Sequence, residues 1–167
     1  RSRARLALSF YNMGEDKKNN IIVIPPLLRK EVFNYQPKQE DFILGYMVNA
    51  GFAENVHDYH NRQPQTCLQF FWDRNDVEEE TQIDDTLTFH RINDIKFLDM
   101  MSRCKAYAST AGFESICEAM YLGKPVLMVP AHIEQDCNGY DAMRAGAGII
   151  SNTFDLDTLQ DFAKTYH

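Results

Sequence analysis

Short apolar runs alternate with amphipathic segments along most of the chain. Runs of strand length occur at Phe42–Met47, Cys67–Trp72, Leu87–His90, Ala106–Ser109, Val126–Val129 and Gly148–Ile150. The apolar spacing between and after these runs predicts helices at Phe52–Asn61, Ile95–Arg103, Phe113–Leu122, about Gln135–Ala145, and from Asp155 onward. Strands that alternate with helices through short connections predict an α/β fold with a doubly wound, Rossmann-like parallel sheet.

Two segments depart from this alternation. The acidic stretch Asp73–Asp85 is expected to be a solvent-exposed loop. The chain before residue 41 holds apolar runs at Leu6–Tyr11 and Ile21–Ile24, and Pro25 and Pro26 stop the second run. Because proline fixes φ and has no N–H, this region is predicted to connect one sheet to another.

Composition narrows the class of protein. The 167 residues have a net charge of −7 and are 44% hydrophobic, which predicts one soluble globular domain with a full core. An acidic chain without Lys/Arg blocks argues against nucleic acid as a partner, and no apolar run approaches the ~20 residues that span a bilayer. The chain begins at Arg1 rather than Met, so we expect it to be a fragment of a longer protein.

The cysteines favour a reducing compartment. No two of them form a Cys-x-x-Cys pair, and most lie in apolar surroundings: Cys67, Cys104, Cys117 and Cys137. Reduced, buried thiols are therefore expected in place of a disulfide framework. We predict a cytoplasmic protein, and peripheral binding at the inner face of a membrane stays open.

Polar side chains gather where two predicted strands end, within Lys105–Asn138. Gly112 opens the helix after the strand Ala106–Ser109, so nearby N–H groups lack partners within the helix and lie at its positive dipole end. A diphosphate is a natural occupant of such a position. Ser115, one turn into the helix, can add a hydroxyl donor.

The same helix carries Glu118, one turn beyond Ser115. A carboxylate there can accept hydrogen bonds from both ribose hydroxyls, which together with a diphosphate describes a nucleoside diphosphate. The alternative is that Thr110 or Ser109 caps the helix while Glu118 is a solvated surface charge. A second cluster favours the ligand: His132, Glu134 and Gln135 follow the next strand, and Glu134 and Gln135 suit sugar hydroxyls.

These positions resemble the donor-binding signature of nucleotide-sugar glycosyltransferases of the GT-B fold. The likeness is to the UDP-glycosyltransferases and the bacterial lipid-linked N-acetylglucosaminyl transferases. The residues that carry it are Gly112, Ser115, Glu118, Gly123, Pro125, Pro130, Glu134 and Gln135. The resemblance implies one half of a two-domain GT-B fold, in which residues 1–25 are the tail of an N-terminal domain and a linker, and residues 26–167 bind the nucleotide sugar.

The resemblance also implies a role for each site residue. Gly112 and Ser115 would hold the diphosphate, Glu118 the ribose, and Glu134 with Gln135 the transferred sugar. His132 could donate to the sugar or a phosphate, or merely pack. Four further assignments follow less directly: Asn49, Gly51 and Thr110 would face the diphosphate, and Ile92 the base. Thr110 stands where many family members have His or Arg.

By the same resemblance the reaction is glycosyl transfer from a nucleotide sugar, expected to be a UDP-sugar, without a cofactor or a metal. The acceptor, a saccharide, a lipid-linked sugar or a small molecule, would bind the N-terminal domain, which would also supply the catalytic base. The fragment alone would then bind a donor but transfer nothing. Two alternatives stay open: a UDP-N-acetylhexosamine 2-epimerase-like enzyme, and a non-catalytic nucleotide-binding domain.

Two further patterns favour structural roles. Asp155-Leu156-Asp157 matches the Asp-x-Asp pattern of metal-dependent glycosyltransferases, but it opens a helix, where capping explains it. His57 and His60 lie at i, i+3, a spacing that can chelate a metal. No third ligand is evident nearby, so a solvated helix face is the expected reading of this pair.

Overall fold

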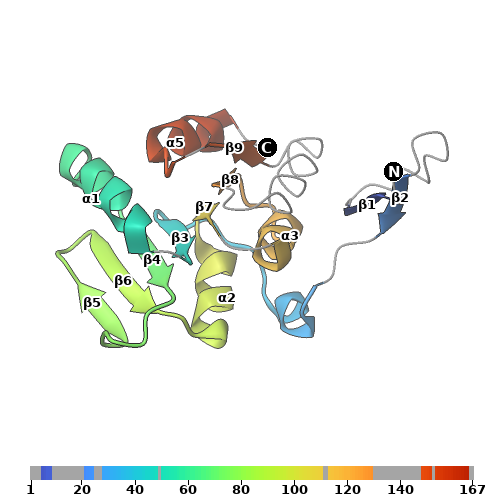
Figure 1. The fold of residues 1–167 in the computed structure, drawn as a ribbon, viewed down its shortest axis with the longest axis horizontal. Coiled ribbons are helices and arrows are strands. Elements are labelled where there is room, and N and C mark those ends of the chain that lie inside the picture. Colours follow the sequence, from blue (N-terminus) through green and yellow to red (C-terminus); the bar gives the residue numbers. More distant parts are fainter. Residues whose placement is uncertain are drawn as a thin grey trace.

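The protein is described by a computed structural model that covers residues 5–8, 21–24, 28–48, 50–110, 113–129, 148–151 and 153–165. Its helices and strands run in this chain order (Figure 1): β1 (Arg5–Leu8), β2 (Ile21–Ile24), the 3-10 helix η1 (Lys30–Asn34), β3 (Ile43–Met47), the 3-10 helix η2 (Ala50–Phe52), α1 (Ala53–Arg62), β4 (Leu68–Trp72), β5 (Glu80–Gln82), β6 (Leu87–Arg91), α2 (Asp94–Arg103), β7 (Ala106–Ser109), α3 (Phe113–Tyr121), β8 (Val126–Met128), β9 (Gly148–Ile150) and α5 (Leu156–Thr165).

Within the described ranges, a sheet of seven strands organises the fold, in the order β5-β6-β4-β3-β7-β8-β9. Every neighbouring pair is parallel except β5 and β6, which are antiparallel. The predicted α/β class with a mostly parallel sheet is confirmed. The prediction of a loop throughout Asp73–Asp85 was wrong at one point, because Glu80–Gln82 adds a short edge strand to β6. The strands β1 and β2 pair with each other in a separate parallel sheet.

Helices cover both faces of the large sheet (Figure 1). One core cluster packs α2, α3 and Val32 of η1 against side chains such as Leu44 and Tyr107. The other packs α1 and α5 against the alternate side chains of the same strands, among them Ile43 and Phe70. Burial on both faces explains why β7 and β8 read as continuous apolar runs.

A glycine in β3 lets the ring of Phe70 on β4 lie over it. Gly45 and Phe70 are register partners in the parallel pair. A Cβ atom built on Gly45 would lie 2.1 Å from Cε2 of Phe70, far closer than two carbons approach without repulsion. Phe70 in turn packs edge-on against Phe154, with ring centroids 5.6 Å apart. Gly45 therefore makes space for an aromatic contact between the sheet and the segment before α5.

The end of α3 shows why the sequence reads Gly123-Lys124-Pro125. Gly123 has a φ of +73°, and its N–H bonds to the carbonyl of Met120 at 3.0 Å, while the N–H of Lys124 bonds to the carbonyl of Ala119 at 2.9 Å. This pair of bonds is the Schellman arrangement, which ends a helix with a residue of positive φ. The helix thus stops where β8 must begin.

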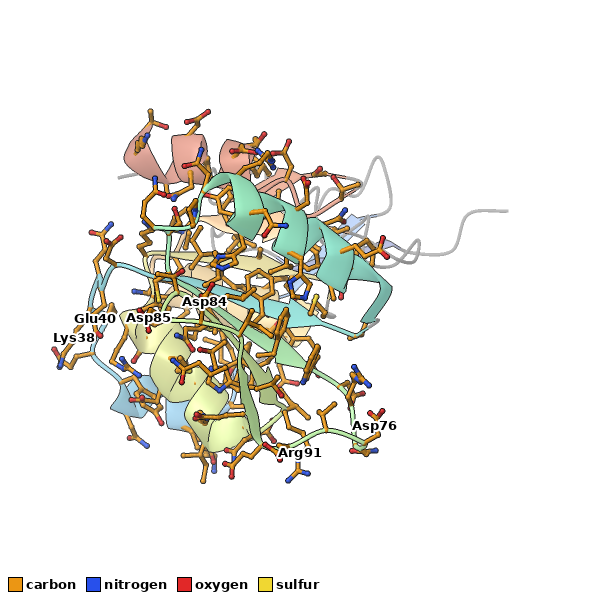
Figure 2. The ribbon with its side chains drawn as sticks, turned by 90° about the vertical axis from the view of Figure 1, so that its left-hand side faces the viewer. Lys38, Glu40, Asp76, Asp84, Asp85 and Arg91 are labelled. Carbon is orange, nitrogen blue, oxygen red and sulfur yellow. The ribbon has the colours of Figure 1, made fainter. Side chains whose placement is uncertain are left out.

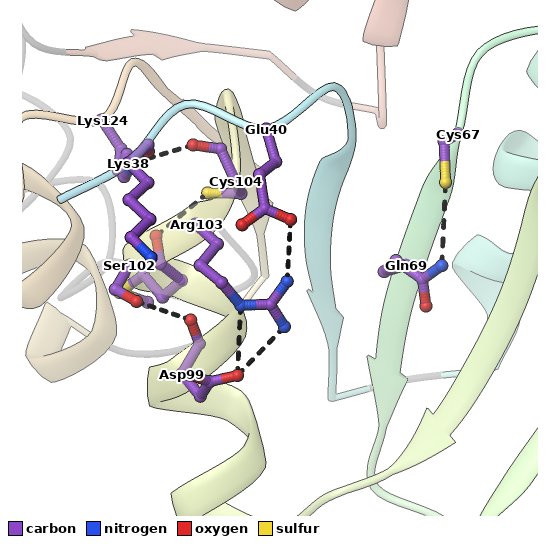
Figure 3. Close-up of polar contacts among 10 residues, drawn as sticks. Lys38, Glu40, Cys67, Gln69, Asp99, Ser102, Arg103, Cys104 and Lys124 are labelled. Atoms are coloured by element: carbon purple, nitrogen blue, oxygen red, sulfur yellow. Dashed lines mark hydrogen bonds and ion pairs between the residues drawn. The ribbon is translucent and has the colours of Figure 1, made fainter. Parts of the chain in front are cut away.

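The connector, residues 28–40, runs along α2 and α3 before it enters β3. Its far end is held by backbone bonds: Lys38 N–H to the carbonyl of Ser102 and Glu40 N–H to that of Arg103, both at 2.7 Å. The buried ammonium of Lys124 donates to the carbonyl of Lys38 and, at 2.7 Å, to that of Cys104 (Figure 3). Burial lowers the pKa of Lys124. These bonds hold the connector against the amino-terminal edge of the sheet.

Figure 2 shows the two edges of the sheet. Lys38 and Glu40 lie with Asp84 and Asp85 toward the edge where β3 and β6 begin, while Asp76 and Arg91 lie toward the edge where β4 and β6 end. Ligands of open α/β sheets bind at the second kind of edge, beyond the carboxyl ends of the strands.

The boundaries of most predicted elements are correct to within one residue, and Ala106–Ser109 and Gly148–Ile150 are matched in full. The helix predicted at about Gln135–Ala145 lies outside the described residues. On α3, Tyr121 is exposed and packs edge-on against the exposed ring of Phe33.

Candidate nucleotide-binding site

A hydrogen bond joins the loops that follow β3 and β7. The N–H of Val48 donates to Oγ1 of Thr110 at 2.9 Å, and the N–H of Thr110 donates to the carbonyl of Tyr46 at 3.0 Å. Thr110 is buried, so its side chain holds the two loops together at the carboxyl edge of the sheet. Gly51, in η2, follows the first of these loops. The two loops that were predicted to flank a diphosphate are thus brought side by side.

Ser115 lies at the third position of α3, where the backbone N–H groups of the first turn have no acceptor within the helix. The phenol of Tyr107, from β7, donates to Oγ of Ser115 at 3.0 Å. Tyr107 is fully buried, and burial raises the pKa of its phenol, which therefore stays protonated. Because Ser115 accepts this hydrogen bond, its own hydroxyl hydrogen points in another direction.

Glu118 lies one turn further along α3 and is fully buried. Both of its carboxylate oxygens accept hydrogen bonds from Arg29, in the connector: Nε to Oε2 at 2.9 Å and Nη2 to Oε1 at 2.8 Å. The alternative that Glu118 is a solvated surface charge was therefore wrong. Burial raises the pKa of Glu118, and the Arg29 guanidinium opposes this rise.

Arg29 also faces two exposed carboxylates. Its Nε lies 3.3 Å from Oε1 of Glu114, and its Nη1 lies 3.6 Å from Oδ1 of Asp94. These acids stand in the first turns of α3 and α2, where a carboxylate compensates the helix dipole. One guanidinium therefore bridges the starts of both helices.

A cavity of about 340 Å³ lies beside this cluster, between the connector and α2. It shares Arg29 and Asp94 with the cluster, and its remaining lining residues are Glu31, Asn34, Tyr35, Ile95 and Leu98. Ile92, predicted to face the base, follows β6 and packs partly buried against the core on the α2 side.

The remaining predicted site residues lie outside the described part of the chain, and their positions stay predictions: Asn49, Gly112, His132, Glu134 and Gln135.

Two residues of the site were not predicted from the sequence, Arg29 and Tyr107. Arg29 stands in a polar segment, 89 residues from Glu118, and no local pattern marks the pair. Tyr107 had a weak signal, because its phenol sits in an otherwise apolar strand and a buried phenol needs a polar partner.

Structural roles were predicted for the Asp155-Leu156-Asp157 pattern and for the His57 and His60 pair. The structure confirms the first prediction and contradicts the second. Asp155 accepts a hydrogen bond from the N–H of Thr158 at 3.1 Å at the start of α5, which confirms capping, and Asp157 pairs with Arg62 at 2.8 Å. The solvated-face prediction was wrong for His60, which is buried with Nε2 2.6 Å from Oδ2 of Asp84. Across the described ranges, no cluster of three or more His, Cys, Asp or Glu residues is placed to hold a metal ion.

An open, mostly parallel sheet with helices on both faces defines an α/β protein, and ligands of such proteins bind beyond the carboxyl ends of the strands. The sequence model described as "Glycosyl transferase family 1" matches residues 1–166. The chain therefore belongs to this glycosyltransferase family.

Similar proteins agree with this assignment. A stretch of 54 residues is 39% identical to a protein of Caenorhabditis elegans named as UDP-glucuronosyltransferase ugt-48, and covers 32% of this chain and 10% of that protein. The glycotransferase of kitacinnamycin has a similar fold, with a TM-score of 0.63 at 16% identity over 89% of this chain and 41% of its own. UGT89C1 of Arabidopsis thaliana, solved with UDP-L-rhamnose, gives a TM-score of 0.54 at 16% identity over 87% and 40%.

These likenesses confirm the fold class, that of GT-B glycosyltransferases. The chain spans about a tenth of the curated relative and about two fifths of each of these two solved structures. Within the described ranges, no helix is long and apolar enough to cross a membrane.

Proposed function

We propose that this chain is the donor-binding part of a glycosyltransferase, and that its ligand is a nucleoside-diphosphate sugar, with UDP as the nucleotide. The observation that carries the proposal is the Tyr107–Ser115 hydrogen bond at the start of α3, one turn before Glu118. N–H and hydroxyl donors at a helix start suit a diphosphate. A carboxylate one turn further suits the two hydroxyls of a ribose.

Membership of the family supports this proposal. One solved protein of similar fold, the rhamnosyltransferase SpnG, is described in complex with thymidine diphosphate, at a TM-score of 0.51 and 15% identity over 77% of this chain and 37% of its own. UGT89C1 is described with UDP-L-rhamnose. Both ligands are nucleoside diphosphates or their sugars, the class proposed here.

The other residues take roles around this centre. Thr110, Asn49 and Gly51 would meet the diphosphate from the loops beyond β3 and β7. Glu134 and Gln135 would bind the transferred sugar, with His132 beside them. Ile92 would lie at the base. The hydrogen bond between Val48 and Thr110 supports the first assignment, because it keeps those loops adjacent.

In this proposal, no metal or cofactor takes part. The N–H groups at the start of α3 and the Ser115 hydroxyl would stabilise the negative charge that develops on the leaving diphosphate. The acceptor and the catalytic base would belong to a preceding domain, of which residues 1–25 are the tail and linker, while residues 26–167 hold the donor. We also propose a cytoplasmic location, a compartment in which thiols such as those of Cys67, Cys104 and Cys117, none of which is in a disulfide bond, stay reduced.

Calorimetric titration with UDP, pyrophosphate and uridine tests this proposal. The chain should bind UDP and pyrophosphate, and Ser115→Ala should weaken both by about fivefold, the effect of losing one hydrogen bond. Glu118→Gln should lower the ratio of UDP affinity to pyrophosphate affinity, because the amide leaves one acceptor oxygen in place of two for the ribose hydroxyls, and pyrophosphate has no ribose. Asp85→Asn, which changes an exposed acidic side chain at the opposite, amino-terminal edge of the sheet, is the control and should leave both affinities unchanged. Failure of UDP and pyrophosphate to bind the unaltered chain would refute the proposal.

A further inference from the structure

The proposed ribose carboxylate is closed to solvent in this structure. The side chain of Glu118 has an exposed fraction of 0%, and both of its oxygens are engaged by Arg29. The two bonds leave further lone pairs on the carboxylate, but the side chain has no exposed surface, so the guanidinium must shift before a ribose hydroxyl can reach Glu118. Arg29 and a ribose therefore compete for the same two acceptor atoms.

Two other carboxylates lie close enough to Arg29 to pair with its guanidinium. The carboxylates of Glu114 and Asp94 lie 3.3 and 3.6 Å from its nitrogens, and their side chains are 61% and 81% exposed. Breaking an ion pair leaves both charges uncompensated, and the cost is largest for the partner that stays buried, here Glu118, to which the ribose hydroxyls would donate in place of Arg29. Here it can move onto these two acids, so leaving Glu118 does not leave the guanidinium unpaired.

The surroundings of Arg29 also allow movement. Its side chain is 25% exposed, and the cavity of about 340 Å³ between the connector and α2 lies directly against it. The connector is held further along, by the burial of Val32 and by the backbone bonds of Lys38 and Glu40. The guanidinium can therefore turn toward Asp94 and the cavity while the rest of the connector stays in place.

We propose that Arg29 is an autoinhibitory latch on the nucleotide site: it holds Glu118 in the empty chain, and moves onto Glu114 and Asp94 when a ribose binds. The proposal rests on the assignment of Glu118 to the ribose. It makes the affinity for a nucleoside diphosphate depend on a residue of the connector that enters the sheet. A fixed structural ion pair, by contrast, would never open.

Arg29→Lys is the first test, because lysine keeps the positive charge but lacks the fork that binds both oxygens. We expect UDP to bind about tenfold more tightly, within the usual range of coupling between sites, while pyrophosphate affinity stays unchanged. The measure is the ratio of UDP affinity to pyrophosphate affinity from calorimetry, which cancels general changes in charge. An unchanged or lowered ratio would overturn the latch.

Asp94→Asn is the second test and changes an exposed side chain, so the fold should persist. It removes one alternative partner of Arg29, strengthens the hold on Glu118 and should lower the same ratio severalfold. An unchanged ratio counts against the latch even if Arg29→Lys fails to fold.

Different results would overturn the latch and the proposed donor site. If the unaltered chain binds UDP and Glu118→Gln lowers the ratio, the donor site stands whatever Arg29 does; if nothing binds UDP, both are wrong.

Discussion

The phenol of Tyr107 and the hydroxyl of Ser115 lie 3.0 Å apart, one in a buried strand and the other in the first turn of the next helix. The contact links the core of the sheet to the edge where ligands of α/β proteins bind. Because Tyr107 is fully buried, the pair sets the orientation of Ser115 from inside the molecule.

Tyr107→Phe should therefore weaken UDP binding severalfold and lower the free energy of unfolding by about 1 kcal/mol, the net value of one hydrogen bond. Urea denaturation gives the stability and calorimetry gives the affinity. Tyr46→Phe is a matched control, since both rings pack edge-on against Phe97, at 5.6 and 5.8 Å between centroids. In a Ser115→Ala background the change at Tyr107 should no longer affect affinity. An equal effect in both backgrounds would show that Tyr107 does not act through Ser115.

Gly45→Ala should destabilise the fold strongly. The new methyl group would lie 2.1 Å from the Phe70 ring, and relief of that overlap requires the aromatic contact with Phe154 to shift. We expect a loss of about 3 kcal/mol in the free energy of unfolding, the upper part of the range for overpacking. The double variant Gly45→Ala/Phe70→Leu should recover part of it. No recovery would mean that the overlap is not the cause.

Gly123→Ala isolates the conformational role of a glycine. Apart from the adjoining backbone, no atom lies within 4 Å of the position that a Cβ would take, but the φ of +73° is unfavourable for alanine. We expect a loss of about 1 kcal/mol, measured by urea denaturation, with no change in core packing. Gly123→Asn should lose less, because asparagine tolerates this conformation better. Equal losses for the two variants would argue against the conformational explanation.

His90 should make the protein sensitive to acid. Its ring stacks on Phe71 with centroids 4.8 Å apart, and Nε2 lies 2.5 Å from Oε1 of Gln69. Burial, and secondarily the charge of Lys96, lower the pKa of His90 to about 4, although Glu80 opposes the shift. The unfolded chain, with a pKa near 6.5, then binds the proton more readily between these values. The stability that neutral His90 contributes is complete above about pH 6.5 and is lost as the pH falls toward 4.

The test compares the pH dependence of the free energy of unfolding between the unaltered chain and His90→Phe. Phenylalanine keeps an aromatic ring stacked on Phe71 but cannot take up a proton. Between pH 7 and 4 the free energy of unfolding of the unaltered chain should fall by roughly 3 kcal/mol more than that of the variant. Chemical denaturation at a series of pH values measures both. Parallel pH profiles would show that His90 does not titrate as its burial implies.

Much of the fold follows from patterns within a few residues. A strand buried on both faces must be apolar throughout, and a helix on a sheet must carry an apolar stripe, so most elements could be placed to within one residue. The short strand β5 was not predicted, because its three residues are polar or charged and lie at an edge of the sheet. His60 was misplaced because the helix was read as solvated, although Val56 and Tyr59 share its buried face.

The sequence by itself determined the strand–turn–helix unit that ends in Ser115 and Glu118, because helical spacing alone places those side chains one turn apart. The tertiary structure decided what surrounds them. Arg29 reaches Glu118 across 89 residues, and Tyr107 reaches Ser115 across the turn between β7 and α3. Local periodicity reports which face of an element is apolar. The partner of a buried charge depends on which distant segments pack together, and only the folded chain shows it.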